Sequence, residues 1–158
     1  IPSLLRARVS ANESATIGDV RTVISGEAAY QSANGGWYDE LSCLDERVRA
    51  GACIPNYPTN APTFLDSAIA SLVSKSGYDR SFTAGDAPAN FSTAISSASS
   101  ISSYAYTATP VSQGQTGVRG FGGDSSGVLC FTTDGAAPGT AGSGINGTLD
   151  MATCSILQ

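Results

Sequence analysis

The sequence has no histidine, a single lysine and few charged residues of either sign. Charged residues make up 13% of the chain, about half of the roughly 25% that is usual. Ser-His-Asp and Cys-His catalysis need an imidazole to accept the proton of the nucleophile, and most catalytic zinc sites use histidine ligands. These mechanisms are excluded, and we predict that the chain is not an enzyme and binds no metal and no cofactor.

Basic residues are too few and too scattered for a nucleic-acid surface. The chain carries eight basic and 13 acidic residues, with a net charge of −5 and a pI near 4.4. Neutralising phosphates needs clustered cations, so no nucleic-acid partner is predicted. The chain also lacks a run of about 20 apolar residues, and we expect none of these residues to form a transmembrane helix.

The pattern along the chain predicts one α+β domain over residues 1–158. Apolar residues recur at helical spacing up to Ala33, and Asn34-Gly35-Gly36 ends this pattern. We divide the domain into four parts. They are an amphipathic helix (1–33), a proline-containing connecting loop (34–76), an antiparallel sheet (77–134) and a C-terminal loop region (135–158).

The N-terminal helix is expected to be longer than the rest of the domain can cover. It would span about 50 Å at 1.5 Å per residue, whereas the remaining residues form a body with a radius of gyration of about 13–14 Å. Its apolar residues form two faces about a quarter turn apart. These are Ile1, Leu5 and Val9 on one face and Ile17, Val20, Ile24 and Ala28 on the other. We expect the second face to cover the sheet and the first to contact neighbouring helices or lipid.

Four later segments have the residue pattern of strands. They are 78–82, 104–109, 117–121 and 128–132. Residues 122–127, between the last two, are predicted to form a hairpin turn. Before the strands, 67–74 is predicted to be a short helix. The serine-rich tract 92–103 is predicted to be a surface loop that leads into a strand.

Four cysteines are present, and none forms a CxxC pair. They are Cys43, Cys53, Cys130 and Cys154. An even number in a serine- and glycine-rich chain predicts two disulfides and an oxidising compartment, either periplasmic or extracellular. Three pairings are possible, and the sequence does not choose among them. Pairing of neighbours along the chain has the lowest loop entropy cost.

Two glycine motifs match chemical signatures but lack the context that the chemistry needs. Residues 123–127 match the G-x-S-x-G nucleophile elbow, which requires a strand–helix junction and a histidine. Residues 142–147 match G-x-G-x-x-G, but no helix follows in a βαβ unit. We interpret the first as a hairpin turn and the second as a loop.

Two groups of acidic residues offer oxygen ligands that could bind calcium. They are Asp39-Glu40 with Asp45-Glu46, and Asp124 with Asp134. Neither group has the spacing of an EF-hand loop. We therefore interpret both as solvated turns.

Several segments resemble bacterial type IV pilins and pseudopilins. Ile1–Arg8 followed by Ala11-Asn12-Glu13 resembles the stretch just after the hydrophobic segment of these proteins. Ile17–Thr22 and Glu27–Tyr30 are similar to the amphipathic half of their long N-terminal helix. Other segments that fit the family come later in the chain. They are Leu65-Asp66, Lys75–Tyr78, Gly117–Phe121 and Asp124–Val128.

The resemblance implies a pilin-like fold. In it, the long N-terminal helix packs on a three- to four-stranded antiparallel sheet, and a disulfide such as Cys130–Cys154 closes a C-terminal loop. Pro2 would correspond to the helix-kinking proline of the family. The family's Gly-Phe-x-x-x-Glu processing signature and hydrophobic run are absent from these 158 residues. We therefore expect this chain to be the part of a longer protein that follows them.

The resemblance also implies a function, as a structural subunit of a type IV pilus-like filament. Such a subunit is held in the inner membrane, facing the periplasm, and then joins an extracellular filament on the bacterial surface. Its partners would be copies of itself or related pilins. The residues expected at the filament interface are Ile1, Pro2, Leu4, Leu5, Arg8 and Val9.

Two other functions remain open at this stage. One is a type II secretion pseudopilin, whose short filament moves folded substrates across the outer membrane. The other is a ligand-binding minor or tip pilin, an adhesin that would use aromatic side chains. The candidates for that role are Trp37, Tyr38, Tyr104 and Tyr106.

Overall fold

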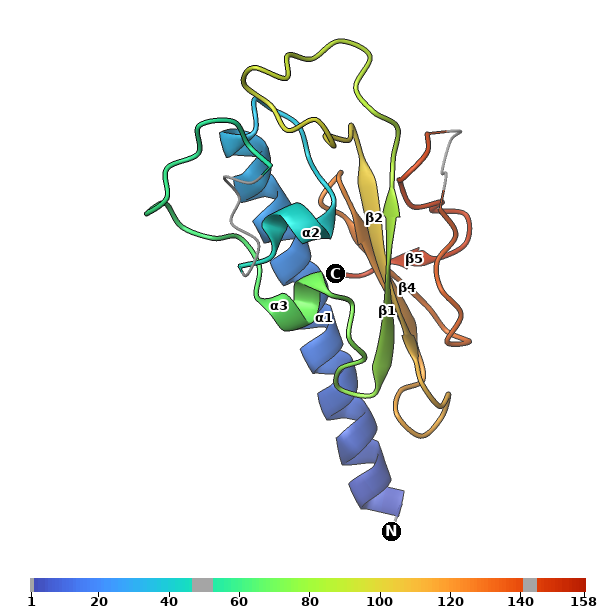
Figure 1. Cartoon of the computed structure of the whole chain (residues 1–158). Coiled ribbons are helices and arrows are strands. Elements are labelled where there is room, and N and C mark those ends of the chain that lie inside the picture. The colour runs from blue at the N-terminus through green and yellow to red at the C-terminus, as the bar shows by residue number, and fades with distance from the viewer. Residues whose placement is uncertain (1, 47–52, 141–144) are drawn as a thin grey trace.

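The protein is an α+β domain in which one long helix lies on a sheet (Figure 1). The computed structural model describes residues 2–46, 53–140 and 145–158. Within these residues it contains three helices and a five-stranded antiparallel sheet. The helices are α1 (Pro2–Ala33), α2 (Leu41–Leu44) and α3 (Ser67–Ala70). The strands are β1 (Tyr78–Ala84), β2 (Tyr104–Pro110), β3 (Gly120–Asp124), β4 (Leu129–Thr132) and β5 (Ser155–Ile156).

The strands follow one another in chain order across the sheet, β1-β2-β3-β4-β5, and all neighbours are antiparallel. The sequence predicted three to four strands and a C-terminal region made of loop alone. Both predictions were wrong, because β5 forms a fifth strand within that region. This two-residue strand pairs with β4 through Cys130 and Ile156. The Cys130–Cys154 disulfide holds β5 beside β4. A prediction from the residue pattern of a single segment does not include such a tertiary constraint. The predicted helix at 67–74 is also shorter, ending at Ala70.

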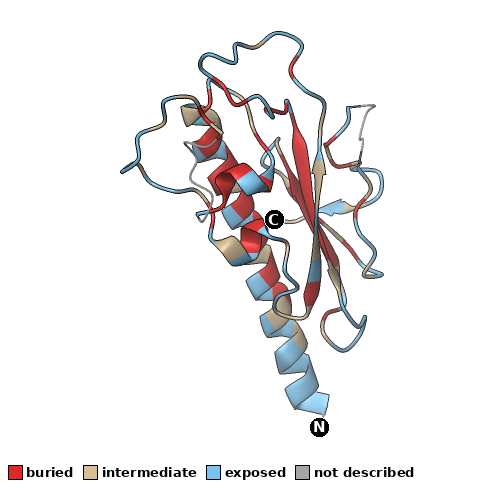
Figure 2. Cartoon of the chain, in the orientation of Figure 1, coloured by how far each residue is buried: buried red, intermediate tan, exposed pale blue. Residues whose placement is uncertain are grey.

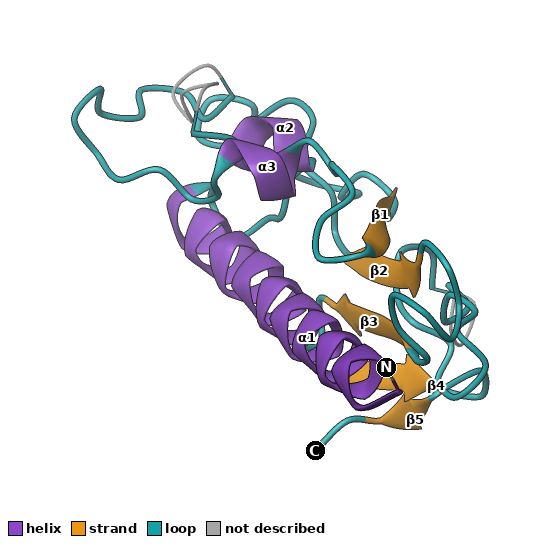
Figure 3. Cartoon of the chain, turned by 90° about the horizontal axis from the view of Figure 1, so that it is seen from below, coloured by secondary structure: helices purple, strands orange, loops and turns teal. Residues whose placement is uncertain are grey.

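Helix α1 lies on one face of the sheet, with α2 and α3 toward the β1 edge (Figure 3). Gly123 of β3 allows this close approach. A Cβ atom on Gly123 would lie 2.7 Å from Val20 Cγ1 and 2.8 Å from Ile24 Cδ1. The glycine-rich sequence of β3 is therefore a packing requirement rather than a weak strand signal.

The sheet-facing side of α1 is one continuous stripe at intervals of three or four residues. Its buried members are Glu13, Thr16, Val20, Val23, Glu27 and Tyr30, and Leu5 and Val9 continue the same line toward the N-terminus. The expectation of two faces a quarter turn apart is therefore wrong. Ile17 and Ile24 lie at the margin and Ala28 is exposed. The interface between α1 and the sheet also contains buried carboxylates and a threonine. A prediction from the spacing of apolar residues alone leaves these polar positions out.

The C-terminal end of α1 confirms the predicted stop. The backbone N–H of Gly36 donates to the Gln31 carbonyl at 2.9 Å, and Gly35 and Gly36 both have positive φ. The serine-rich tract then packs against this end rather than forming a purely surface loop. Asn34 Nδ2 donates to Ser100 Oγ, and the N–H of Ser97 donates to Asn34 Oδ1.

Both disulfides join neighbouring cysteines along the chain, Cys43 with Cys53 and Cys130 with Cys154. Of the three possible pairings, the structure has the one with the shortest loops. The first pair ties the end of α2 to the connecting loop, and the second ties the C-terminus to β4. The two disulfides thus hold segments that have little regular structure of their own.

Candidate functional site

The first turns of α1 extend beyond the end of the sheet, as Figure 2 shows. We call residues 2–12 the projecting segment. Leu4 and Leu5 are 64% and 42% exposed, and Val9 is half-buried. Pro2, Arg6 and Arg8 are exposed. Of the predicted interface residues, only Ile1 lies outside the described residues.

A groove runs beside the projecting segment where α1 leaves the sheet. It has a volume of about 390 Å³ and lies between α1 and the loop that joins β2 to β3. Leu5 and Val9 line it from the helix, and Val118, which is 40% exposed, lines it from the loop. The apolar stripe of α1 thus continues past the sheet, and none of the residues that the structure describes covers it there.

Glu13 fixes the point at which α1 leaves the domain. Its Oε1 accepts hydrogen bonds from the N–H groups of Val118 and Arg119, and its Oε2 accepts two from the Arg119 guanidinium at 3.0 and 3.1 Å. Burial alone would raise the pKa of Glu13, but these hydrogen bonds outweigh it and hold the pKa below its usual value. Arg119 in turn lies over the rings of Phe121 and Phe131.

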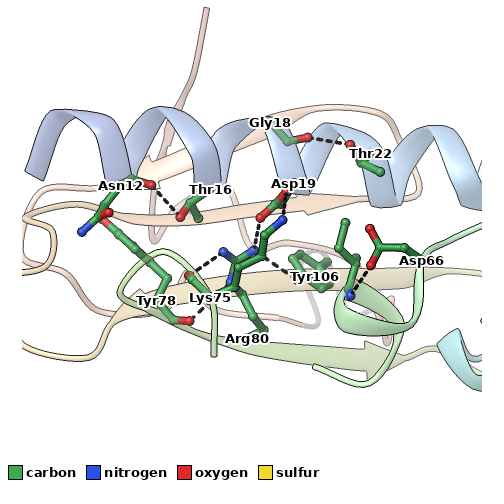
Figure 4. Close-up of polar contacts among 11 residues, drawn as sticks. Asn12, Thr16, Gly18, Asp19, Thr22, Asp66, Lys75, Tyr78, Arg80 and Tyr106 are labelled. Atoms are coloured by element: carbon green, nitrogen blue, oxygen red, sulfur yellow. Dashed lines mark hydrogen bonds and ion pairs between the residues drawn. The ribbon is translucent and has the colours of Figure 1, made fainter. Parts of the chain in front are cut away.

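A second polar contact joins the middle of α1 to β1 (Figure 4). Asp19 forms ion pairs with Arg80 and Lys75, each at 3.1 Å. The Arg80 side chain is only 2% exposed, and its remaining N–H groups donate to the carbonyls of Lys75 and Tyr78 and to Tyr106 Oη. A buried guanidinium with all these partners holds the helix in one position against the sheet.

A third carboxylate, Glu27, is fully buried near the C-terminal end of α1. Its Oε1 accepts a hydrogen bond from the N–H of Asp39 at 3.2 Å, and its Oε2 has no partner among the described residues. Burial, together with the nearby Asp39 charge, raises the pKa of Glu27 well above its usual value. Asp39 itself accepts from Tyr30 Oη and Ser99 Oγ.

These carboxylates are structural rather than catalytic in their geometry. Glu13 and Asp19 are occupied by ion pairs, and Glu27 and Asp39 are closed off from solvent. Asp39 also lies near both sulfurs of the Cys43–Cys53 disulfide. Because the two sulfurs are bonded to each other, they are not available as metal ligands.

Among the described residues, neither acidic group considered as calcium ligands is gathered into a cluster of three or more ligand atoms. Asp124 and Asp134 flank opposite ends of the β3–β4 hairpin. Asp124 accepts instead from the Ser126 and Leu149 N–H groups. Asp39, Asp45 and Asp124 are buried, so the interpretation of these groups as solvated turns is wrong for them. The carboxylates of Asp39 and Asp124 accept hydrogen bonds from backbone N–H groups, which charge alone does not reveal.

The remaining sequence motifs are structural as well. A turn between two strands is present, but its predicted bounds were wrong. Residues 122–124 belong to β3, which begins at Gly120 rather than at 117, and the turn covers 125–128. Part of the 142–147 motif lies outside the described residues. Tyr104 and Tyr106 are buried, so they cannot stack on a ligand. Tyr38 is half-buried and donates a hydrogen bond to the Ser125 carbonyl.

Comparison of the chain with protein-family models, with curated proteins and with solved structures gives no match. Among the described helices, none is both long enough and apolar enough to cross a bilayer. The candidate site therefore rests on the geometry of the chain itself. The sequence predicted the exposed part of α1 but missed Glu13, Asp19 and Glu27. The only sequence signal is that Glu13 and Glu27 lie on the sheet-facing stripe and that Asp19 lies beside it.

Proposed function

We propose that this protein is a structural subunit of a type IV pilus-like filament, and that it assembles through the projecting segment. The observation that carries the proposal is the uncovered continuation of the α1 stripe. Leu4 and Leu5 are exposed on a helix whose remaining turns are held rigidly on the sheet. Large exposed apolar side chains grouped at one end of a domain are typical of an interaction surface.

The three carboxylate contacts support a mechanical role for α1. Glu13, Asp19 and Glu27 connect the helix to the β2–β3 loop, to β1 and to the loop before α2. A load on the projecting segment would be shared by contacts spread along the whole domain. Burying each leucine against a neighbouring subunit would contribute about 1.5–3 kcal/mol, repeated at every subunit. The filament would lie outside the cell, with the subunit in the inner membrane before assembly.

The test uses the double substitution Leu4→Asp/Leu5→Asp in the cells that produce the protein. We expect surface filaments, counted by electron microscopy and recovered by shearing, to be lost while the subunit still accumulates in folded form. The matched control is Ile95→Asp/Ile156→Asp, which places the same charges on two exposed apolar residues away from the projecting segment. Filaments that persist with both leucines replaced would refute the proposal.

A further inference from the structure

The charge of the chain is distributed very unevenly between the projecting segment and the rest. Residues 2–12 contain Arg6 and Arg8 and no acidic residue. Residues 13–158 contain all 13 acidic residues but only six of the eight basic ones, a net charge of −7. The acidic residue next to the segment, Glu13, is neutralised by Arg119. One end of the molecule is therefore cationic and the remainder is anionic.

The cationic residues flank the apolar stripe of the projecting segment. At 100° per residue, Arg6 lies to one side of Leu5 and Arg8 lies to the other side of Val9. Both arginines are exposed, and neither is held by an ion pair among the described residues. Their long apolar stems can lie along the stripe while their guanidinium groups reach outward to phosphates.

The apolar surface near the two arginines extends beyond Leu5 and Val9. The groove continues it from these two residues to Val118 in the β2–β3 loop, and Leu4 adds a second exposed leucine on the far side of Arg8. Apolar side chains bordered by cations, at the end of an otherwise acidic domain, are complementary to an anionic phospholipid surface. A nucleic acid or an acidic protein would use the cations but would leave the leucines uncovered.

We propose that the projecting segment binds the surface of a bilayer that contains anionic phospholipid. Leu4, Leu5 and Val9 enter the boundary between headgroups and acyl chains, and Arg6 and Arg8 contact the phosphates. The net charge of −7 on the rest of the domain is repelled by the same surface, so the domain is oriented with its sheet away from the bilayer. The proposal concerns the same segment as filament assembly but does not require assembly.

The binding is expected to be weak and reversible, because few side chains take part. Each arginine near an anionic surface contributes about 1 kcal/mol, so loss of both lowers the partition coefficient about 30-fold. The electrostatic part also weakens as salt is added, since the Debye length shortens.

The experiment measures co-sedimentation of the 158-residue chain with vesicles made of equal parts of phosphatidylglycerol and phosphatidylcholine. We expect binding to these vesicles that salt reduces, and much weaker binding to pure phosphatidylcholine. Arg6→Gln/Arg8→Gln should lower binding about 30-fold. The matched control is Arg21→Gln, which removes an exposed arginine of α1 beside the sheet and should leave binding unchanged. Circular dichroism checks that the variants are folded.

Three outcomes would overturn the proposal. They are equal binding to both vesicle types, an equal loss with Arg21→Gln, and no binding at millimolar lipid. Sedimentation of the chain without vesicles would show instead that a second copy covers the segment. Absence of lipid binding would leave the filament proposal standing, because the leucine test measures assembly separately.

Discussion

Replacing Glu27 by glutamine tests whether the buried carboxyl of α1 is protonated in the folded protein. Glutamine has nearly the same shape, so its carbonyl oxygen can still accept the Asp39 N–H that Glu27 Oε1 accepts at 3.2 Å. Its amide nitrogen would occupy the place of Oε2, which has no partner within the described part of the chain. The titratable groups around Glu27 are Asp39, Tyr30, Tyr38 and Tyr104.

The expected effect depends on pH in a defined direction. Burial raises the pKa of Glu27 well above its ordinary value of 4.5, so the folded protein holds this proton more tightly than the unfolded chain does. The free energy of unfolding therefore falls as the pH rises above about 4.5, by up to about 1.4 kcal/mol per pH unit, until the folded pKa is passed. Glu27→Gln carries no proton to lose and should be increasingly more stable than the wild type over this range.

The assay is urea unfolding of the disulfide-intact protein at a series of pH values from about 4.5 upward. The matched control is Glu40→Gln, at an exposed glutamate, whose stability should follow the wild type at every pH. Glu13 affects stability at acidic pH instead. Because its pKa is lowered in the folded protein, the stability that Glu13 contributes is lost as the pH falls through this lowered pKa. Parallel curves for the wild type and Glu27→Gln would show that Glu27 is ionised when buried and that the reasoning is wrong.

Two further substitutions test how α1 is held. Gly18→Ala should raise the free energy of unfolding by about 0.5–1 kcal/mol, because nothing lies within 4 Å of the new Cβ and alanine favours the helix. Gly26→Ala should have the opposite sign and lower it by about 1–2 kcal/mol, since its Cβ would lie 2.8 Å from Leu65 Cδ2; equal effects would contradict the packing. Arg80→Met leaves Asp19 buried without its best-shielded partner and should lower the free energy of unfolding by about 3 kcal/mol. A loss below about 1 kcal/mol in urea unfolding would show that this ion pair does not anchor the helix.

Much of the fold could be predicted because its signals are local. Helix α1 ends where Asn34 and two glycines interrupt the helical pattern, and β2 lies in an aromatic and β-branched run. The projection of α1 followed from length alone, since a helix of this size exceeds what the remaining residues can cover. The even number of cysteines predicted two disulfides, and the structure has them.

The errors share one cause, which is that partners distant in the chain decide burial. The stripe of α1 was misplaced because Glu13, Asp19 and Glu27 look like solvent-facing residues until their partners are known. The serine-rich tract looked like a surface loop, but Asn34 satisfies its polar groups inside the domain. Strand β5 is held by the Cys130–Cys154 disulfide and by two residue pairs with β4. The sequence of β5 itself does not predict a strand.

The sequence by itself determined that this chain lacks imidazole chemistry, that it forms a long helix followed by a sheet, and that the first turns of the helix carry apolar and basic residues with no acidic ones. These properties follow from composition and from periodicity along a single segment. Only the tertiary structure decided which face of the helix is covered and where that cover ends. The physical reason is that a carboxylate can be buried only where a distant group supplies its hydrogen bonds or its proton.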